Sequence, residues 1–127
     1  MASRKRPPLS DGETRILTLV WQLERATVRE VCDELPDNWD ITYATVQTLL
    51  RRLEKKGYLA HEVEGKSHVF FASVEKEQVV KRTVGDFVDR LFGGEVMPLM
   101  LHLAKAGRLK KSDIDRLKKL IDEEGSS

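Results

Sequence analysis

The sequence predicts a mainly α-helical protein with a single β-hairpin near its middle. Before residue 57, apolar side chains recur with the 3.6-residue period of helices. Between residues 59 and 72, β-branched and aromatic residues surround a glycine-containing turn, which is typical of a two-stranded hairpin. After residue 73, three further amphipathic segments return to the helical period. We therefore expect helices on both sides of one hairpin.

Length and charge limit the functions that the chain can have. A chain of 127 residues can form one domain of ordinary core size with a helical appendage, which excludes large multidomain enzymes. Charged residues make up 34% of the chain but the net charge is only +1, so any nucleic-acid-binding surface must be a local patch. Cys32 is the only cysteine, which excludes an intrachain disulfide. The sequence has neither an apolar membrane span nor a signal peptide, and we expect a cytoplasmic protein.

Two capping boxes predict the starts of the first two helices. Ser10 and Glu13 can satisfy each other's free backbone amides at the start of a helix over residues 11–24, and Thr27 and Glu30 can do so for the next helix. The second helix must end before Pro36 because proline cannot continue it. The side chains that we expect these helices to bury are Ile16, Leu17, Val20, Leu23, Val28, Val31, Cys32 and Leu35.

The third predicted helix, over residues 42–56, carries the most informative pattern. Thr42 can cap its start, and Gly57 can close its end in a left-handed conformation. Its apolar stripe consists of Val46, Leu49, Leu50 and Leu53. The other side carries small and amide-bearing side chains first and cations further along. Two helices with a tight link, the second bearing a polar face, form a helix-turn-helix arrangement.

That polar face has the order expected of a DNA recognition helix. A helix that enters the major groove by its N-terminal end needs side chains that reach base edges there, with cations near the flanking phosphates. Gln47 can pair with adenine through two hydrogen bonds. Helix capping by Thr45, a surface role for Thr48 and packing of Tyr43 on Trp39 remain open alternatives. The residues of this helix that we expect to contact DNA are Thr42, Tyr43, Ala44, Thr45, Gln47, Thr48, Arg51, Arg52 and Lys55.

The hairpin is expected to form a wing. Its strands, at residues 59–63 and 67–72, are joined by Glu64-Gly65-Lys66. Lys66 at the tip is expected to contact a DNA phosphate. An isolated hairpin is marginally stable, so the wing should pack on the helices through its apolar side chains, which are Val69, Phe70 and Phe71. The predicted fold class is thus mainly α, a winged helix-turn-helix with a two-stranded wing followed by a helical dimerisation region.

Three amphipathic helices are expected after the wing. The first is capped by Ser73 and runs to about Phe92, the second contains Pro98 in its first turn, and the third begins with a capping box at residues 112–115. The remaining chain offers nothing to cover their apolar faces, so we expect them to bury against the same helices of a second subunit. The expected dimer contacts are Phe87, Leu91, Phe92, Leu99 and Leu101.

These elements divide the chain into three parts. Residues 1–8, which include Arg4, Lys5 and Arg6, are predicted to be a flexible basic arm, with entry into a DNA minor groove as the alternative. The other two parts are a winged-helix DNA-binding domain over residues 9–72 and a helical dimerisation region over residues 73–127.

Four blocks of sequence resemble the penicillinase repressor (BlaI/MecI) family. They are LSDGETRILTLVW at residues 9–21, ATVREV at 26–31, ATVQTLLRRLEKKGYL at 44–59 and LFGGEVMPLML at 91–101. The resemblance covers almost all of the chain from Leu9 to Leu120. It implies a winged-helix repressor that dimerises through its C-terminal helices and binds inverted-repeat operators until an inducing signal arrives. By position, it also implies base contacts from Ala44, Thr45, Gln47 and Thr48.

Two features depart from the family pattern. Resistance repressors of this type are inactivated when a sensor protease, the antirepressor, triggers cleavage of an Asn-Phe bond, and here His102-Leu103 stands at the matching place. Copper-responsive relatives carry paired cysteines near the C-terminus, whereas this chain has only Cys32. The resemblance therefore implies a sensor-protease partner without the family's scissile bond, and it leaves the inducing signal open.

Other function classes fit the sequence less well. An enzyme is not expected, because His61, His68 and His102 lie far apart and no motif surrounds Cys32 or any serine. His61 and His68 could face each other across the hairpin, but two ligands are too few for a metal sensor, and we expect no metal ion or cofactor. We expect a homodimeric, sequence-specific repressor that binds double-stranded DNA. The main alternative is a winged-helix protein-interaction module without specific DNA readout.

Overall fold

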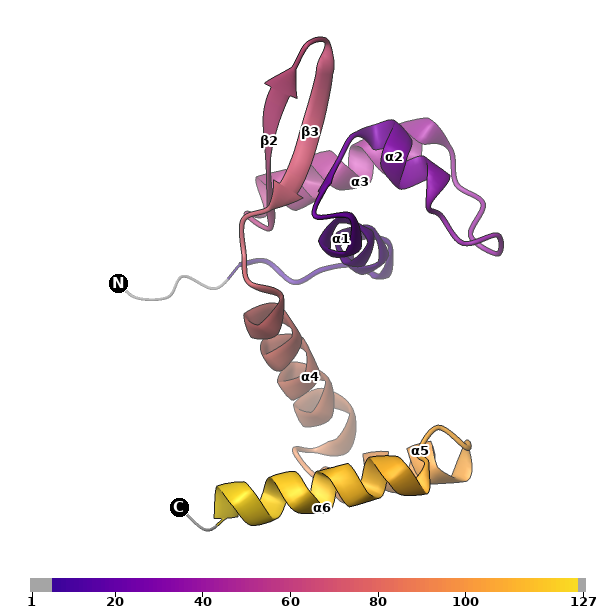
Figure 1. The fold of residues 1–127 in the computed structure, drawn as a ribbon, viewed down its shortest axis with the longest axis vertical. Helices are drawn as coiled ribbons and strands as arrows, with labels where there is room; N and C mark the ends of the chain where they lie inside the picture. The colour runs from indigo at the N-terminus through magenta and orange to yellow at the C-terminus, as the bar shows by residue number, and fades with distance from the viewer. Residues whose placement is uncertain (1–5, 126–127) are drawn as a thin grey trace. The chain divides into compact units, whose positions relative to one another are not determined.

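The computed structural model describes residues 6–125. The chain divides into two compact units, with the boundary between Val79 and Val80. The first unit holds three helices and an antiparallel sheet, with the β2–β3 hairpin extending away from the helices (Figure 1). Its elements are α1 (Asp11–Leu23), β1 (Arg25–Ala26), α2 (Val28–Asp33), α3 (Tyr43–Lys55), β2 (Leu59–Glu64) and β3 (Ser67–Ala72). The later helices are α4 (Lys76–Phe92), α5 (Met97–Lys105) and α6 (Lys111–Gly125). The predicted winged helix-turn-helix is confirmed.

Both predicted capping boxes form. The Ser10 hydroxyl accepts a hydrogen bond from the Glu13 N–H (3.1 Å), and the Glu13 carboxylate accepts one from the Ser10 N–H (2.9 Å). Thr27 and Glu30 make the same reciprocal pair, at 3.1 and 2.8 Å. These bonds satisfy backbone amides that lack a partner within the first turn of each helix. α1 and α2 therefore begin where the sequence predicts.

The three helices of the first unit bury the predicted apolar stripes in one core. Gly57 ends α3 with a φ of 91°, which a residue with a Cβ atom rarely adopts. The core has as its fully buried side chains Ile16, Leu17, Val20, Ala26, Val31, Val46, Leu50 and Leu53. This packing fixes which side of α3 remains exposed, because an α-helix that buries one stripe must present the opposite side to solvent.

The sheet contains a strand that the sequence analysis missed. The strand order is β1-β3-β2, and β1 pairs Arg25 with Phe71 and Ala26 with Phe70. A strand of two residues is too short to show an alternating pattern. Glu24, between α1 and β1, has a φ of 70°, in the left-handed half of conformational space. The wing is thus attached to the helices through β1 as well as through its own apolar side chains.

Two predicted helix starts differ in the structure. Ser73 does not cap α4, which begins three residues later; its hydroxyl donates to the Gly57 carbonyl instead (2.9 Å). Ser112 lies within α6, whose first turn is held by the Asp113 carboxylate accepting from the Lys110 N–H (2.9 Å). Asp113 can take this role because the third helical residue reaches back to the backbone amide three residues earlier.

The last residues of the predicted arm have partners in the first unit. Tyr58 donates a hydrogen bond to the Pro7 carbonyl (2.8 Å), and Lys56 donates one to the Pro8 carbonyl (2.9 Å). Arg6 donates to the Gly57 carbonyl (2.9 Å). Arg4 and Lys5 lie outside the described residues. Residues 6–8 therefore run along the segment that follows α3.

α4, α5 and α6 bury few of their own side chains. In these helices Val88 is the buried side chain, with 8% of its surface exposed, and α5 and α6 bury none. Pro98 lies in the first turn of α5, as predicted. Across residues 6–125, no helix is both long and apolar enough to span a membrane.

Candidate nucleic-acid interface

The start of α3 is held by a pair of threonine hydroxyls. The Thr42 hydroxyl accepts a hydrogen bond from the Thr45 N–H (3.1 Å) and lies 3.0 Å from the Thr45 hydroxyl. Both side chains are exposed at the surface. Because both hydroxyls take part in the cap, a DNA contact from either would compete with that cap. The capping alternative for Thr45 is therefore the one present in this structure.

One exposed edge of α3 carries Tyr43, Gln47 and Arg51, which we call the groove stripe. Their four-residue spacing places them one above another on the helix. Tyr43 is 51% exposed, Arg51 is exposed and Gln47 is half-buried. An aromatic ring, an amide and a guanidinium thus follow one another along this edge, in the order in which a recognition helix meets bases and then phosphates.

A second row of predicted residues lies beside the groove stripe. Ala44, Thr48, Arg52 and Lys55 are all exposed, and their spacing places them on one side of the helix; we call them the open stripe. The side chains of its cations make no ion pair or hydrogen bond with another described residue. The open stripe lies opposite the buried face of α3 and the groove stripe lies between the two, so both stripes are available to a partner together.

A depression of about 310 Å³ lies between α2, α3 and the wing. It brings the groove stripe together with Lys66 at the wing tip, as the sequence analysis requires of a DNA-binding surface. Gly65, with a φ of 62°, and Lys66 form the turn between the paired residues Glu64 and Ser67. The residues that line the depression are Thr27, Val28, Arg29, Tyr43, Gln47, Arg51, Lys66, Ser67, His68 and Phe70.

The cations that line this depression are free of intramolecular partners. The side chains of Arg29, Arg51 and Lys66 are exposed, and none of these side chains makes an ion pair or hydrogen bond with a described residue. They come from α2, α3 and the wing respectively. Positive charges that converge from several elements and lack counter-charges can neutralise a phosphate backbone without first breaking an ion pair.

Arg29 and His68 also line the depression, although the sequence analysis did not assign them to the interface. Arg29 follows the capping residue Thr27 and points away from the buried face of α2. His68 pairs with Val63 across the hairpin, next to its tip. The exposed position of Arg29 opposite the α2 core stripe was a signal in the sequence. The position of His68 depends on the hairpin register, which the sequence did not determine to the residue.

Arg25 in β1 makes ion pairs with acidic side chains of the wing strand β2. Arg25 from β1 lies 2.9 Å from the Glu62 carboxylate, also contacts Glu64, and has its guanidinium 5.7 Å from the centre of the Phe71 ring. The hydrogen bond to Glu62, reinforced by Glu64, raises the pKa of Arg25. Arg25 is therefore occupied by acidic partners on its own sheet, unlike Lys66.

The two wing histidines lie side by side but are not directly opposite each other in the hairpin, because His61 pairs with Phe70 and His68 pairs with Val63. The rings of His61 and His68 stack with their centres 4.5 Å apart, and Nδ1 of His61 lies 2.6 Å from a carboxylate oxygen of Glu54. In the described part of the chain, no group of three or more His, Cys, Asp or Glu side chains is placed to hold a metal ion. Burial raises the pKa of the Cys32 thiol, which disfavours its reactive thiolate.

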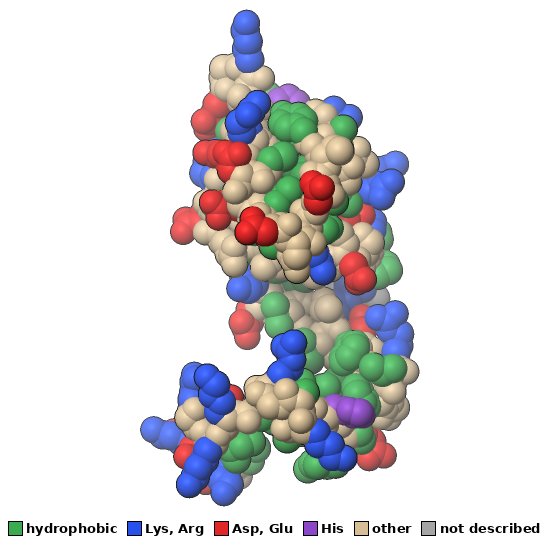
Figure 2. Space-filling view, turned by 90° about the vertical axis from the view of Figure 1, so that its right-hand side faces the viewer, with side chains coloured by type: hydrophobic (Ala, Val, Ile, Leu, Met, Phe, Trp, Pro, Cys, Tyr) green, Lys and Arg blue, Asp and Glu red, His purple; other side chains and the backbone are tan. Residues whose placement is uncertain are grey.

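The predicted dimer contacts fall on an apolar surface of α4 and α5. Phe87, Leu91 and Leu101 are 43%, 64% and 52% exposed, whereas Phe92 and Leu99 are partly covered. Phe87 and Phe92 pack edge to face at 6.0 Å. Figure 2 shows hydrophobic side chains at the surface of these C-terminal helices. Further exposed apolar side chains are Val80, Val84, Val96, Met97, Ile114, Leu117, Leu120 and Ile121.

Comparison with known proteins identifies the family. Residues 9–123, which include the wing, helices α1 to α5 and most of α6, match the sequence model of the family described as "Penicillinase repressor". The chain belongs to the penicillinase repressor family. The resemblance seen in the four sequence blocks is thereby confirmed, and it extends through the C-terminal helices.

Relatives within the penicillinase repressor family match over nearly their whole length. The penicillinase repressor of Bacillus licheniformis is 27% identical over 120 residues, with 94% of each chain covered. The methicillin resistance regulatory protein MecI of Staphylococcus aureus is 22% identical over 114 residues, with 90% of this chain and 93% of MecI covered. These matches therefore cover nearly the whole length of both chains.

Solved structures resemble the first unit most clearly. The DNA-binding domain of the repressor BlaI is 32% identical, with a TM-score of 0.51 over 58% of this chain and 90% of the domain. Monomeric BlaI of Bacillus licheniformis, solved with the blaP half-operator, is also 32% identical, with a TM-score of 0.50 over 59% of this chain and 92% of BlaI. MarR of E. coli shares the fold, at 14% identity and a TM-score of 0.53, over 91% of this chain and 76% of MarR.

The residue pair His102-Leu103, which stands at the place of the Asn-Phe pair described above, lies inside a helix. The His102–Leu103 bond is in α5, with His102 exposed and Leu103 partly covered. The His102 ring lies 6.4 Å from the ring of Phe92. The backbone around this bond takes part in helical hydrogen bonds, so the bond is not presented on an open loop.

Proposed function

We propose that this penicillinase repressor family member binds double-stranded DNA sequence-specifically and represses transcription as a homodimer on an inverted-repeat operator. The observation that carries the proposal is the convergence of unpaired Arg29, Arg51 and Lys66 on a depression that also exposes Gln47. Further support comes from BlaI of Bacillus licheniformis, which resembles the first unit and has been solved with a half-operator.

Local electrostatics favours DNA binding at this surface. The net charge of +1 gives little attraction for DNA over the molecule as a whole. The interface cations Arg51, Arg52, Lys55 and Lys66 have no acidic partners among residues 6–125, whereas Arg25 and Lys56 are paired with carboxylates. Phosphates would therefore be drawn to α3 and the wing tip, and each contact would release counterions.

Sequence readout would come from the N-terminal half of α3. Gln47 can donate to and accept from adenine in the major groove, with about 1–3 kcal/mol of discrimination for a good pair. Ala44 and Thr48 present a small side chain and a methyl-bearing side chain, which suit contact with a thymine methyl group. Arg51, further along the groove stripe, is placed to meet a phosphate.

Dimerisation would cover the apolar surface of α4, α5 and α6. These helices leave large side chains such as Leu91 and Leu101 more than half exposed. Exposed apolar clusters on this scale mark interaction surfaces in soluble proteins. A twofold dimer would present two copies of α3, so the operator should be an inverted repeat with half-sites about 34–36 Å apart, or a multiple of one helical turn.

Selection from a random duplex library tests this proposal. The wild-type protein should enrich an inverted repeat. A variant with Arg51→Ala and Lys66→Ala should lose affinity for it and reduce the salt slope by about 4, because the dimer loses two phosphate contacts in each subunit. The matched control, Lys81→Ala with Lys118→Ala, removes the same charge from α4 and α6 and should retain the enriched site. If the wild type enriches no sequence and loses DNA at moderate salt, the protein-interaction alternative replaces the proposal.

A further inference from the structure

Four cations lie between residues 51 and 56, and Lys56 is the one among them whose side chain is only partly exposed. Its side chain is 26% exposed, and its ammonium lies 2.6 Å from a carboxylate oxygen of Glu13. The Glu13 side chain is 2% exposed, so the pair joins a buried carboxylate to the residue that follows α3. A lysine held in this way is not available to a phosphate on the outer side of the helix.

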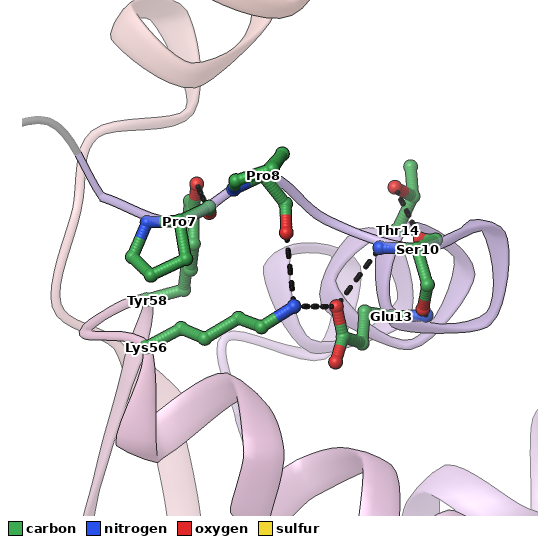
Figure 3. Close-up of polar contacts among 7 residues, drawn as sticks. All are labelled: Pro7, Pro8, Ser10, Glu13, Thr14, Lys56 and Tyr58. Atoms are coloured by element: carbon green, nitrogen blue, oxygen red, sulfur yellow. Dashed lines mark hydrogen bonds and ion pairs between the residues drawn. The ribbon is translucent and has the colours of Figure 1, made fainter.

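The Glu13–Lys56 pair joins three segments of the chain (Figure 3). The same Glu13 oxygen that meets Lys56 also accepts the Ser10 N–H at 2.9 Å, and Lys56 also donates to the Pro8 carbonyl at 2.9 Å. The start of α1, residues 7–8 and the end of α3 therefore share one set of polar contacts. Tyr58 adds a hydrogen bond to the Pro7 carbonyl at 2.8 Å.

These contacts restrain α3 in a way that its apolar face does not. α3 packs on the core through Val46, Leu50 and Leu53, and apolar contact is non-directional. Such packing tolerates small rotations and shifts if the buried volume is preserved. A charge-assisted hydrogen bond has a preferred length and angle. Because Lys56 lies directly after α3, its bond to Glu13 restrains the axial position and rotation of that helix relative to α1.

We propose that Glu13 and Lys56 are a positioning pair for α3, which holds the groove stripe in the register needed to discriminate operator from other DNA, without a phosphate contact by Lys56. The inference rests on the proposed function, since it assumes that α3 reads the operator. A small displacement of Gln47 would weaken a two-bond base contact, which depends on geometry. Phosphate contacts by long, flexible cations would adapt to the same displacement.

The test compares the wild type with two variants that retain the capping box. Glu13→Gln keeps an oxygen for the Ser10 N–H and removes the buried charge. The double variant Glu13→Gln with Lys56→Met removes both charges, so that no unpaired charge is left buried, a replacement that proteins often tolerate. Lys81→Met is the matched control, because it removes an exposed lysine from α4. Each protein is titrated with the enriched operator and with a scrambled duplex, at a temperature where circular dichroism shows it fully folded.

We expect both positioning variants to lose about fivefold to a hundredfold in preference for the operator, the range set by one two-bond base contact. Their affinity for the scrambled duplex and their salt slope should match those of the wild type and of Lys81→Met. An unchanged operator preference in the folded variants would overturn the inference, because the pair would then serve stability alone. A salt slope lower by about 2 in the double variant, with equal losses of affinity for both duplexes, would also overturn it, because Lys56 would then make one phosphate contact in each subunit. A wild type without operator preference would instead overturn the proposed function, and the inference with it.

Discussion

Glu13 and Lys56 lie 43 residues apart in the sequence, yet their side chains meet at 2.6 Å and join the start of α1 to the end of the predicted recognition helix. Burial by itself raises the pKa of the Glu13 carboxyl, but the hydrogen bonds from Lys56 and Ser10 and the positive charge of Lys56 outweigh it and lower the pKa overall. The carboxylate thus remains charged in the folded protein at pH values where a free glutamate begins to protonate.

The Glu13–Lys56 pair predicts a specific loss of stability in acid. Because the pKa of Glu13 is lower in the folded state than in the unfolded state, the stabilisation is complete above the ordinary glutamate value of about 4.5 and is lost as the pH falls through the folded value. Glu13→Gln should lower the free energy of unfolding at neutral pH by about 1.5–3 kcal/mol, the contribution of a hydrogen bond to a charged group. Urea unfolding at pH 7 and at about pH 3.5 measures both effects. The gap between wild type and variant should narrow in acid; a gap that is constant with pH would exclude linkage to Glu13.

Glu24 offers a test of backbone strain. Its φ of 70° and ψ of −50° suit glycine better than a residue with a Cβ atom. Glu24→Gly should therefore raise the free energy of unfolding by about 1 kcal/mol, after the entropy of the glycine is subtracted from the relieved strain. Glu24→Ala is the matched control, because it removes the carboxylate but keeps the strain. Equal changes in thermal midpoint for the two variants would assign the effect to charge and not to conformation.

Substitutions of Gln47 and Arg51 should reduce DNA binding in different ways, although the two residues are neighbours in the groove stripe. Gln47→Ala should reduce affinity for the operator by about 1–3 kcal/mol and leave the scrambled duplex unaffected, because it removes a base contact. Arg51→Ala should weaken binding to both duplexes and lower the salt slope by about 2, because it removes one phosphate contact from each subunit of the dimer. Fluorescence anisotropy at several salt concentrations separates the two effects. If both substitutions weaken the two duplexes by the same factor, the assignment of base and phosphate roles is wrong.

Leu101→Asp should separate the proposed dimer into monomers. Leu101 is 52% exposed in the single chain, and a carboxylate there would be buried without a partner in an apolar dimer contact. Sedimentation velocity should show a monomer, and affinity for the full inverted repeat should fall towards that for a half-site because the linked second contact is lost. Gln22→Glu on the exposed side of α1 adds the same charge and should leave the dimer intact. A Leu101→Asp protein that sediments as a dimer would remove this residue from the contact.

Local signals explain why most of the first unit could be predicted. The Ser10/Glu13 and Thr27/Glu30 boxes are satisfied within three residues, and the left-handed Gly57 ends α3 through its own backbone. Where a local signal was misleading, a distant partner competed for the same group. Ser73 could cap α4, but its hydroxyl donates to Gly57, which is 16 residues earlier.

The sequence by itself determined the helices, the hairpin and the buried stripe of α3, because helical periodicity and capping act over a few residues. The buried stripe in turn determined which side of α3 can face a partner. Only the tertiary structure decided which cations are free. Lys55 and Lys56 are adjacent in an apparently uniform basic cluster, yet Lys55 is exposed without an ion pair and Lys56 is held by a buried carboxylate. It likewise decided that β1 attaches the wing and that Arg29 and His68 join the interface. Such contacts depend on groups far apart in the chain, whose proximity arises only when the core packs.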